Sequence, residues 1–189
     1  MSSTVASPWS AAADGSDAAP QPCSVAVIYD DAASRGRAIE LCDRLIHHFW
    51  QELQFRVNWW KSAHLDDADI APAAAWSVRH AQIVIFSAVN RSELPAAQQT
   101  WLQAALANPG EDGRMLIGFA DTSSGQTGAA PPLLHTLHTC ALLAGMDFLP
   151  HLTPGLDVLA GAARHARGTA GMTSVLSSIL HQPLPPPRL

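Results

Sequence analysis

The feature that most constrains the fold of this chain is an alternation of short apolar runs with segments of helical period. The apolar runs predict strands at residues 23–29, 55–60, 82–87, 114–120 and 147–152. Between them, apolar residues recur three and four positions apart, which indicates helices with one apolar face. Strands that alternate with helices form a parallel sheet covered on both faces. The sequence therefore predicts an α/β, doubly wound, three-layer sandwich with a five-stranded parallel sheet.

The helices can be placed from their apolar faces and from residues that begin or end helices. The first is expected to begin at about Ser34, because Ser is a good N-cap. Its predicted core face is Ala38, Leu41, Cys42, Leu45 and Phe49. A second helix is expected at 72–80. The predicted core face of the helix after residue 87 is Leu94, Ala97, Trp101, Leu102 and Ala105. A helix over 132–144 should stop at Gly145, which suits a C′ position.

Composition limits the classes of protein to which this chain can belong. Its 189 residues, 48% of them hydrophobic, predict one domain over 23–181, with a flexible tail at 1–22 and a proline-rich tail at 182–189. The net charge of −5 argues against nucleic acid as a partner, and no apolar run is long enough for a membrane helix. Three cysteines without CxxC spacing indicate reduced thiols and predict a cytoplasmic protein. The expected partner is an unidentified protein or a second copy of the chain.

Two segments resemble known proteins of the flavodoxin fold. Residues 74–106 are similar to the middle of NAD(P)H:quinone and FMN reductases, with an apolar strand, a short loop, a proline and an amphipathic helix. Residues 124–150 resemble the same group, in which a Gly-Gln loop precedes a helix ending in Gly-Met. The resemblance implies a flavodoxin-like fold, with ligands at the carboxyl ends of the strands.

The loop after the first strand departs from what a flavin phosphate needs. Small residues and hydroxyls at a helix N-terminus favour a phosphate, but this loop begins with Asp30 and Asp31. Two carboxylates repel a dianion, which Ser34, Arg35 and Arg37 offset only in part. The loops at 88–94 and 121–131 also contain no aromatic residue for the flavin ring. The sequence predicts no cofactor, with FMN as the alternative.

The acidic pair also resembles the magnesium-binding pair of response-regulator receiver domains. Those domains need a phosphoacceptor Asp at the end of the third strand, where this chain has Ser87 and Ala88. They also need a Lys after the fifth strand, where Pro150 and His151 stand. The sequence therefore predicts no aspartyl phosphorylation. In another interpretation, Asp30 and Asp31 serve solubility and cap the first helix.

Polar residues at three neighbouring strand ends form the candidate ligand-binding cleft. They are Asp30, Asp31, Ser34, Ser87, Asn90, Asp121 and Thr122. The acidic pair would favour a cation or an amine-bearing ligand by charge complementarity. No GxSxG motif is present, so no catalytic residue and no metal site are assigned. The sequence predicts a flavodoxin-like binding or regulatory module, in signalling for example, without a flavin or phosphoacceptor site. The alternative is an FMN-dependent NAD(P)H oxidoreductase with an atypical phosphate loop.

Overall fold

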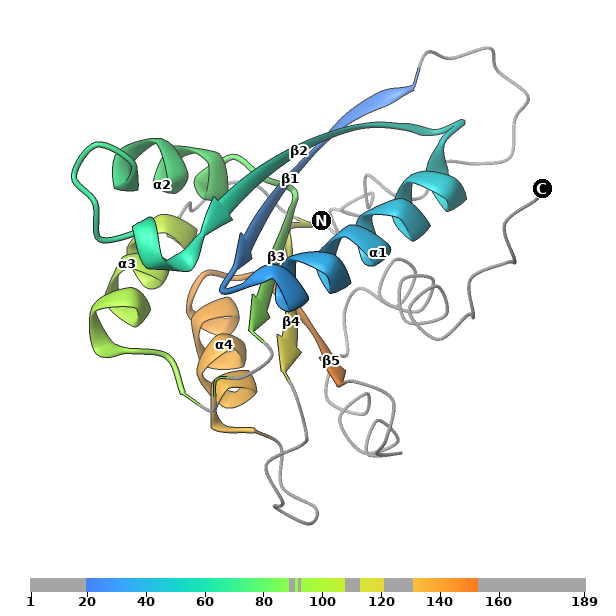
Figure 1. Cartoon of the computed structure of the whole chain (residues 1–189). Helices are drawn as coiled ribbons and strands as arrows, with labels where there is room; N and C mark the ends of the chain where they lie inside the picture. The colour runs from blue at the N-terminus through green and yellow to red at the C-terminus, as the bar shows by residue number, and fades with distance from the viewer. Residues whose placement is uncertain (1–19, 89–90, 92, 108–112, 121–130, 153–189) are drawn as a thin grey trace, which may run out of the picture.

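Five parallel strands form one sheet in the computed structural model, which describes residues 20–88, 91, 93–107, 113–120 and 131–152 (Figure 1). The strands are β1 (Gln21–Tyr29), β2 (Leu53–Lys61), β3 (Ile83–Ala88), β4 (Met115–Ala120) and β5 (Asp147–Leu152). Their spatial order is β2-β1-β3-β4-β5, and each neighbouring pair is parallel. This is the flavodoxin-like order of a doubly wound sheet, so the predicted fold class is confirmed.

Helices cover both faces of the sheet (Figure 1). They are α1 (Ala32–Phe49), α2 (Ala71–Arg79), α3 (Ala96–Leu106) and α4 (Pro132–Leu143), with the short 3-10 helix η1 (Ser62–His64) after β2. Inward side chains of α1 pack with one set of strand residues, and those of α2, α3 and α4 pack with the other set. The strands β3 and β4 are buried at every residue, as continuous apolar runs predict.

Alternation along β2 separates its two tryptophans. Trp59 packs against the core on the α1 side, and Trp60 packs against the core on the other side. Successive side chains of a strand point to opposite faces, so adjacent aromatic residues serve two different cores.

Two local predictions are wrong. The helix α1 begins at Ala32 and its N-cap is Asp31, whereas Ser34 was expected to be the cap. The helix α3 is rotated relative to its predicted face, because Ala97 is exposed and Gln98 is buried. Gln98 is a polar residue that faces the interior, because its side-chain amide has hydrogen-bond partners inside the protein.

A buried arginine holds the amino edge of the sheet together. Arg114 precedes β4, is 2% exposed, and donates hydrogen bonds to the carbonyl oxygens of Val78, Ala81 and Leu106 at 2.8 to 3.1 Å. Val78 and Leu106 lie in the last turns of α2 and α3, where carbonyls lack partners within the helix. A cation there also complements the negative ends of both helix dipoles.

At two positions near α4 the structure favours glycine over a residue with a side chain. Gly118 in β4 lies directly under α4, and a Cβ atom there would come within 3.0 Å of Leu134 and Leu137. Gly145 follows the helix with φ of +67° and ends it as the sequence predicts. No helix among the described residues has the length and apolar character to cross a membrane.

Candidate functional site

The carboxyl ends of β1 and β3 and the first turn of α1 bring together a hydrogen-bonded group of Asp31, Ser34 and Ser87, here called the capping cluster. The Asp31 carboxylate accepts a hydrogen bond from the Ser34 amide at 2.8 Å. The Ser34 hydroxyl oxygen in turn accepts the amides of Asp30 and Asp31, at 3.1 and 2.8 Å. The hydroxyl of the fully buried Ser87 donates to the Ser34 carbonyl at 2.8 Å. The reciprocal bonds between Asp31 and Ser34 are a capping box, which fixes the entry into α1.

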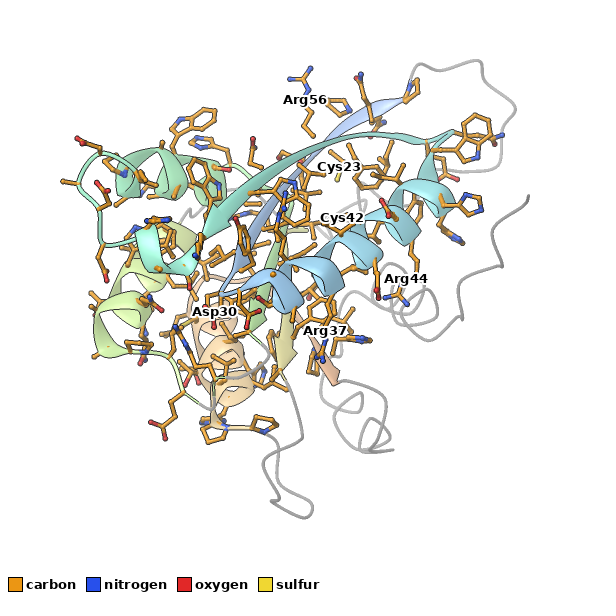
Figure 2. The ribbon with its side chains drawn as sticks, in the orientation of Figure 1. Cys23, Asp30, Arg37, Cys42, Arg44 and Arg56 are labelled. Carbon is orange, nitrogen blue, oxygen red and sulfur yellow. The ribbon has the colours of Figure 1, made fainter. Side chains whose placement is uncertain are left out.

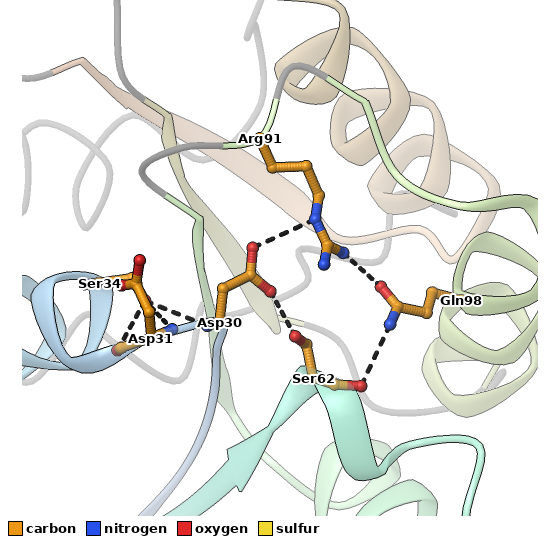
Figure 3. A network of polar contacts seen from close by, with 6 residues as sticks. All are labelled: Asp30, Asp31, Ser34, Ser62, Arg91 and Gln98. Carbon is orange, nitrogen blue, oxygen red and sulfur yellow. Dashed lines mark hydrogen bonds and ion pairs between the residues drawn. The ribbon is translucent and has the colours of Figure 1, made fainter.

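Next to this cluster, four residues from four separate segments form a closed circuit of polar contacts, here called the polar ring (Figure 3). Asp30 follows β1, Ser62 begins η1, Arg91 follows β3, and Gln98 lies in α3. The Ser62 hydroxyl donates to one carboxylate oxygen of Asp30. The other oxygen lies 3.3 Å from Nε of Arg91.

Gln98 closes the polar ring on its far side. Its side-chain oxygen accepts a hydrogen bond from Nη1 of Arg91 at 2.6 Å, and its Nε2 donates to the Ser62 carbonyl at 3.1 Å. The amide is thus satisfied at both ends, which explains how Gln98 can be 7% exposed. The ring ties the loop after β3 to the ends of β1 and β2.

The arginine of the polar ring is held in one orientation by its partners, but they do not use all of its hydrogen-bond donors. Two of its guanidinium nitrogens, Nε and Nη1, have partners, and among the described residues Nη2 has none. The Arg91 side chain is 29% exposed, whereas that of Asp30 is 13% exposed. An oriented guanidinium with remaining donors is a group that binds carboxylates and phosphates well.

An aromatic pair lies beside the same edge, on the α1 face of β1 and β2. The rings of Tyr29 and Trp59 meet edge to face, with centroids 6.3 Å apart. The Arg35 guanidinium lies 5.8 Å from the Tyr29 centroid and 5.6 Å from that of Trp59. These distances are those of cation–π contacts, and they place the exposed Arg35, in the first turn of α1, over this aromatic pair.

Four of the seven predicted cleft residues come together. Asp30, Asp31, Ser34 and Ser87 share the hydrogen bonds described above, as expected for residues at adjoining strand ends, and Figure 3 shows the first three of them. Asn90, Asp121 and Thr122 lie outside the described residues. The acidic pair does not present two free carboxylates to a cation, because Asp30 faces Arg91 and Asp31 caps α1.

Sequence reasoning did not single out Ser62, Arg91 or Gln98 as site residues. A signal for Arg91 was present, since an arginine just after the third strand lies at the same sheet edge as an aspartate just after the first. A signal for Gln98 was its position four residues before Leu102 on an otherwise apolar helix face. Ser62 carried no such signal.

Comparisons with known proteins give structural likeness only. No protein-family model matches the chain, and no curated protein sequence matches it. A flavodoxin from Streptococcus pneumoniae is 15% identical over 69% of this chain and 83% of its own, with a TM-score of 0.45. A flavodiiron protein from Thermotoga maritima is 12% identical over 84% of this chain and 35% of its own, with a TM-score of 0.47. The flavodiiron core of Flv1 from Synechocystis is 15% identical over 85% of this chain and 34% of its own, with a TM-score of 0.44.

These neighbours correct one prediction. The sequence predicted no cofactor, and that prediction is wrong on this comparison, because the neighbours are flavodoxins and flavodiiron proteins. The chain spans about a third of the length of the flavodiiron proteins, and the fold itself is assigned from the strand order.

Proposed function

We propose that this chain is a flavodoxin-like binding module that takes an anionic small ligand, with a phosphate or carboxylate group, at the carboxyl edge of its sheet. The observation that carries the proposal is the Arg91 guanidinium, which Asp30 and Gln98 hold in place while Nη2 has no partner within the part of the chain that the structure describes. Ligands of doubly wound sheets bind at this edge. The exposed Arg35 at the first turn of α1 adds positive charge nearby.

The contacts of the acidic pair favour a ligand class different from the cation or amine expected from sequence alone. A cation or amine would need free carboxylates, and both carboxylates of the acidic pair already have donors from the protein. An anion instead meets one oriented arginine, whose partner Asp30 is the more buried of the two. FMN is the first compound to test, because it carries a phosphate dianion.

The test compares ligand-induced stabilisation in three proteins: wild type, Arg91→Gln and Asp30→Asn. FMN and a nucleoside diphosphate are titrated, and the melting temperature of each protein is compared with its own value without ligand. A ligand that binds only the folded state raises that temperature. We expect a rise in wild type, its loss in Arg91→Gln, and an equal or larger rise in Asp30→Asn, which keeps the arginine and removes a competing charge.

A purely structural ion pair predicts a different pattern. Both substitutions would then lower the melting temperature without ligand, and neither would alter a ligand-induced rise. The same result, or no rise in wild type with any phosphate- or carboxylate-bearing probe, contradicts the proposal. If FMN binds, adding NADH or NADPH without oxygen tests the oxidoreductase alternative, since hydride transfer would bleach the flavin absorbance.

A further inference from the structure

The α1 side of β4 and β5 is an apolar face that is almost wholly covered. Ile117 and Phe119 of β4 and Leu149 of β5 belong to the α1-side core and are 0%, 3% and 8% exposed. Among the described residues, α1 is the one helix in that core, and it packs on β1, β2 and β3. Neighbours within a sheet cover the sides of a side chain but not its outer end. This face therefore needs a cover that the described elements do not supply.

The width of the sheet explains why one helix is not enough on this side. Neighbouring strands lie about 4.8 Å apart, so five strands span about 19 Å from one edge to the other. A helix with its side chains is about 10 Å wide and covers about two strands. The opposite side of the sheet carries α2, α3 and α4, whereas α1 is alone on this side among the described helices. A second helix over β4 and β5 would complete the layer.

The flank of α1 that faces β4 is also partly covered. Arg35 contacts Trp59, which turns its own flank of α1 towards β2. Arg37 and Arg44 lie on the opposite flank by helical spacing, and Figure 2 shows both there. Both residues are partly buried, and the Nε atom of Arg44 is buried. A neighbour on the β4 side of α1 accounts for this burial.

We propose that residues 172–180, which lie outside the described residues, form an amphipathic helix that docks on β4 and β5 beside α1. The apolar residues of this segment recur with helical period. They are Met172, Val175, Leu176 and Ile179. No charged residue occurs from 168 to 187, which suits a segment that is largely buried. Ser174 and Ser177 fall on the opposite side of such a helix, where it meets water.

The course of the chain brings this segment, and not a separate molecule, to the α1 side. The strand β5 ends at Leu152, and residues 153–171 join it to the segment. On the other side of the sheet α4 already packs on both β4 and β5, so the α1 side is where a segment returning from β5 finds apolar surface. A tethered segment meets that surface at an effective concentration of about a millimolar, which a second copy or another protein does not reach. The proposal agrees with the domain that the sequence predicts over residues 23–181.

The first test places one cysteine on β5 and one in the segment, within the full-length chain. Leu149→Cys is combined in turn with Val175→Cys, Leu176→Cys or Ile179→Cys, and, as matched controls, with Ser174→Cys or Ser177→Cys. A disulfide forms only when the two Cα atoms lie within about 7 Å, so the bond reports where the segment lies. The native thiols are buried and do not compete.

After mild oxidation in dilute solution, the apolar positions should give a disulfide within one chain, seen as a change in mobility on a non-reducing gel. The serine positions should not, because they point away from the sheet. A disulfide that links two chains overturns the proposal, because a second copy then supplies the cover. Equal yields at apolar and serine positions, or no disulfide at any apolar position, also overturn it.

A charge on each side of the segment gives an independent test. Leu176→Asp sets a carboxylate against the apolar face, and its desolvation should lower the melting temperature of the full-length protein by about 5–10 °C. Ser177→Asp is the matched control on the outward side, and its melting temperature should stay within about 1 °C of wild type. Wild type should melt at one temperature over about a hundredfold range of concentration, since a cover within one chain does not depend on association. A tolerated Leu176→Asp, or a melting temperature that rises with concentration, contradicts the proposal.

Discussion

Asp30 and Asp31 are neighbours with the same side chain, and the fold gives them different roles. Asp31 acts within its own turn, where its carboxylate caps α1 through Ser34. Asp30 acts across the molecule, where its two oxygens meet Ser62 and Arg91. The first role follows from sequence spacing, because an acidic residue at an N-cap accepts an amide of its own first turn. The second depends on which strand ends lie side by side.

Replacing Asp31 isolates its capping role. Asp31→Ala should lower the free energy of unfolding by about 1 kcal/mol, because the amide of Ser34 loses its acceptor at the start of α1. Asp31→Asn is the control, since its side-chain oxygen accepts the same bond, and it should stay close to wild type. Urea denaturation measures both values. Equal losses in the two variants would show that charge, and not capping, is what Asp31 supplies.

At the scale of elements, the position of α4 depends on a strand residue without a side chain. Gly118 pairs with Phe86 on one side and Pro150 on the other, in the middle of β4. A Cβ atom there would lie 3.0 Å from Leu134 and Leu137 and 3.1 Å from Phe148. The helix can thus approach the strand closely, and its leucines fill the space above the glycine.

Adding methyl groups at this contact should push α4 away from the sheet. Gly118→Val is expected to lower the free energy of unfolding by about 1–3 kcal/mol through overpacking. Gly36→Ala is the matched control, because a Cβ in that turn of α1 meets nothing within 4 Å, and helix propensity should raise the free energy by about 0.5–1 kcal/mol. Thermal and urea unfolding of both variants measure these two changes in the free energy of unfolding. A tolerated Gly118→Val would mean that α4 has room to shift.

The whole molecule has two cores, one on each face of the sheet, and both thiols of the α1-side core are buried. Figure 2 shows Cys23 and Cys42 between the strands and α1. Burial raises the pKa of Cys23 from its ordinary 9.0 to about 11. Burial, with a smaller contribution from the Asp43 charge, raises the pKa of Cys42 to about 12. The folded state therefore keeps two protons that the unfolded chain loses above pH 9.

This difference predicts a loss of stability in alkali. Below pH 9 both states hold the thiol protons and the contribution is complete. As the pH rises from 9 towards 11, unfolding releases protons, and each thiol should lower the free energy of unfolding by about 1.4 kcal/mol per pH unit. Urea denaturation at about pH 8, 9.5 and 10.5 measures the slope. The variant Cys23→Ala, Cys42→Ala should show a shallower slope, and an unchanged slope would assign the loss to other groups.

The sheet could be predicted from the sequence, but only part of the candidate site could. The strands could be predicted because buried parallel strands are continuous apolar runs, as β3 and β4 are. The capping cluster was within reach because Asp31 and Ser34 are three residues apart. The polar ring was not, since Ser62, Arg91 and Gln98 meet only when three separate segments fold together. The phase of α3 was missed for the same reason, because Gln98 is buried by its bonds to those segments.

The guanidinium of Arg114 also limits how this sequence can change over evolutionary time. The carbonyl oxygens of Val78, Ala81 and Leu106 all accept hydrogen bonds from this one buried side chain, and that of Val78 also accepts from the Ala81 amide at 3.4 Å. No other single side chain offers five donors in one plane, so losing the arginine would leave several acceptors in a dry interior at once. A descendant without Arg114 must therefore also alter the ends of α2 and α3. Diverging relatives should keep this arginine while the exposed residues around it vary.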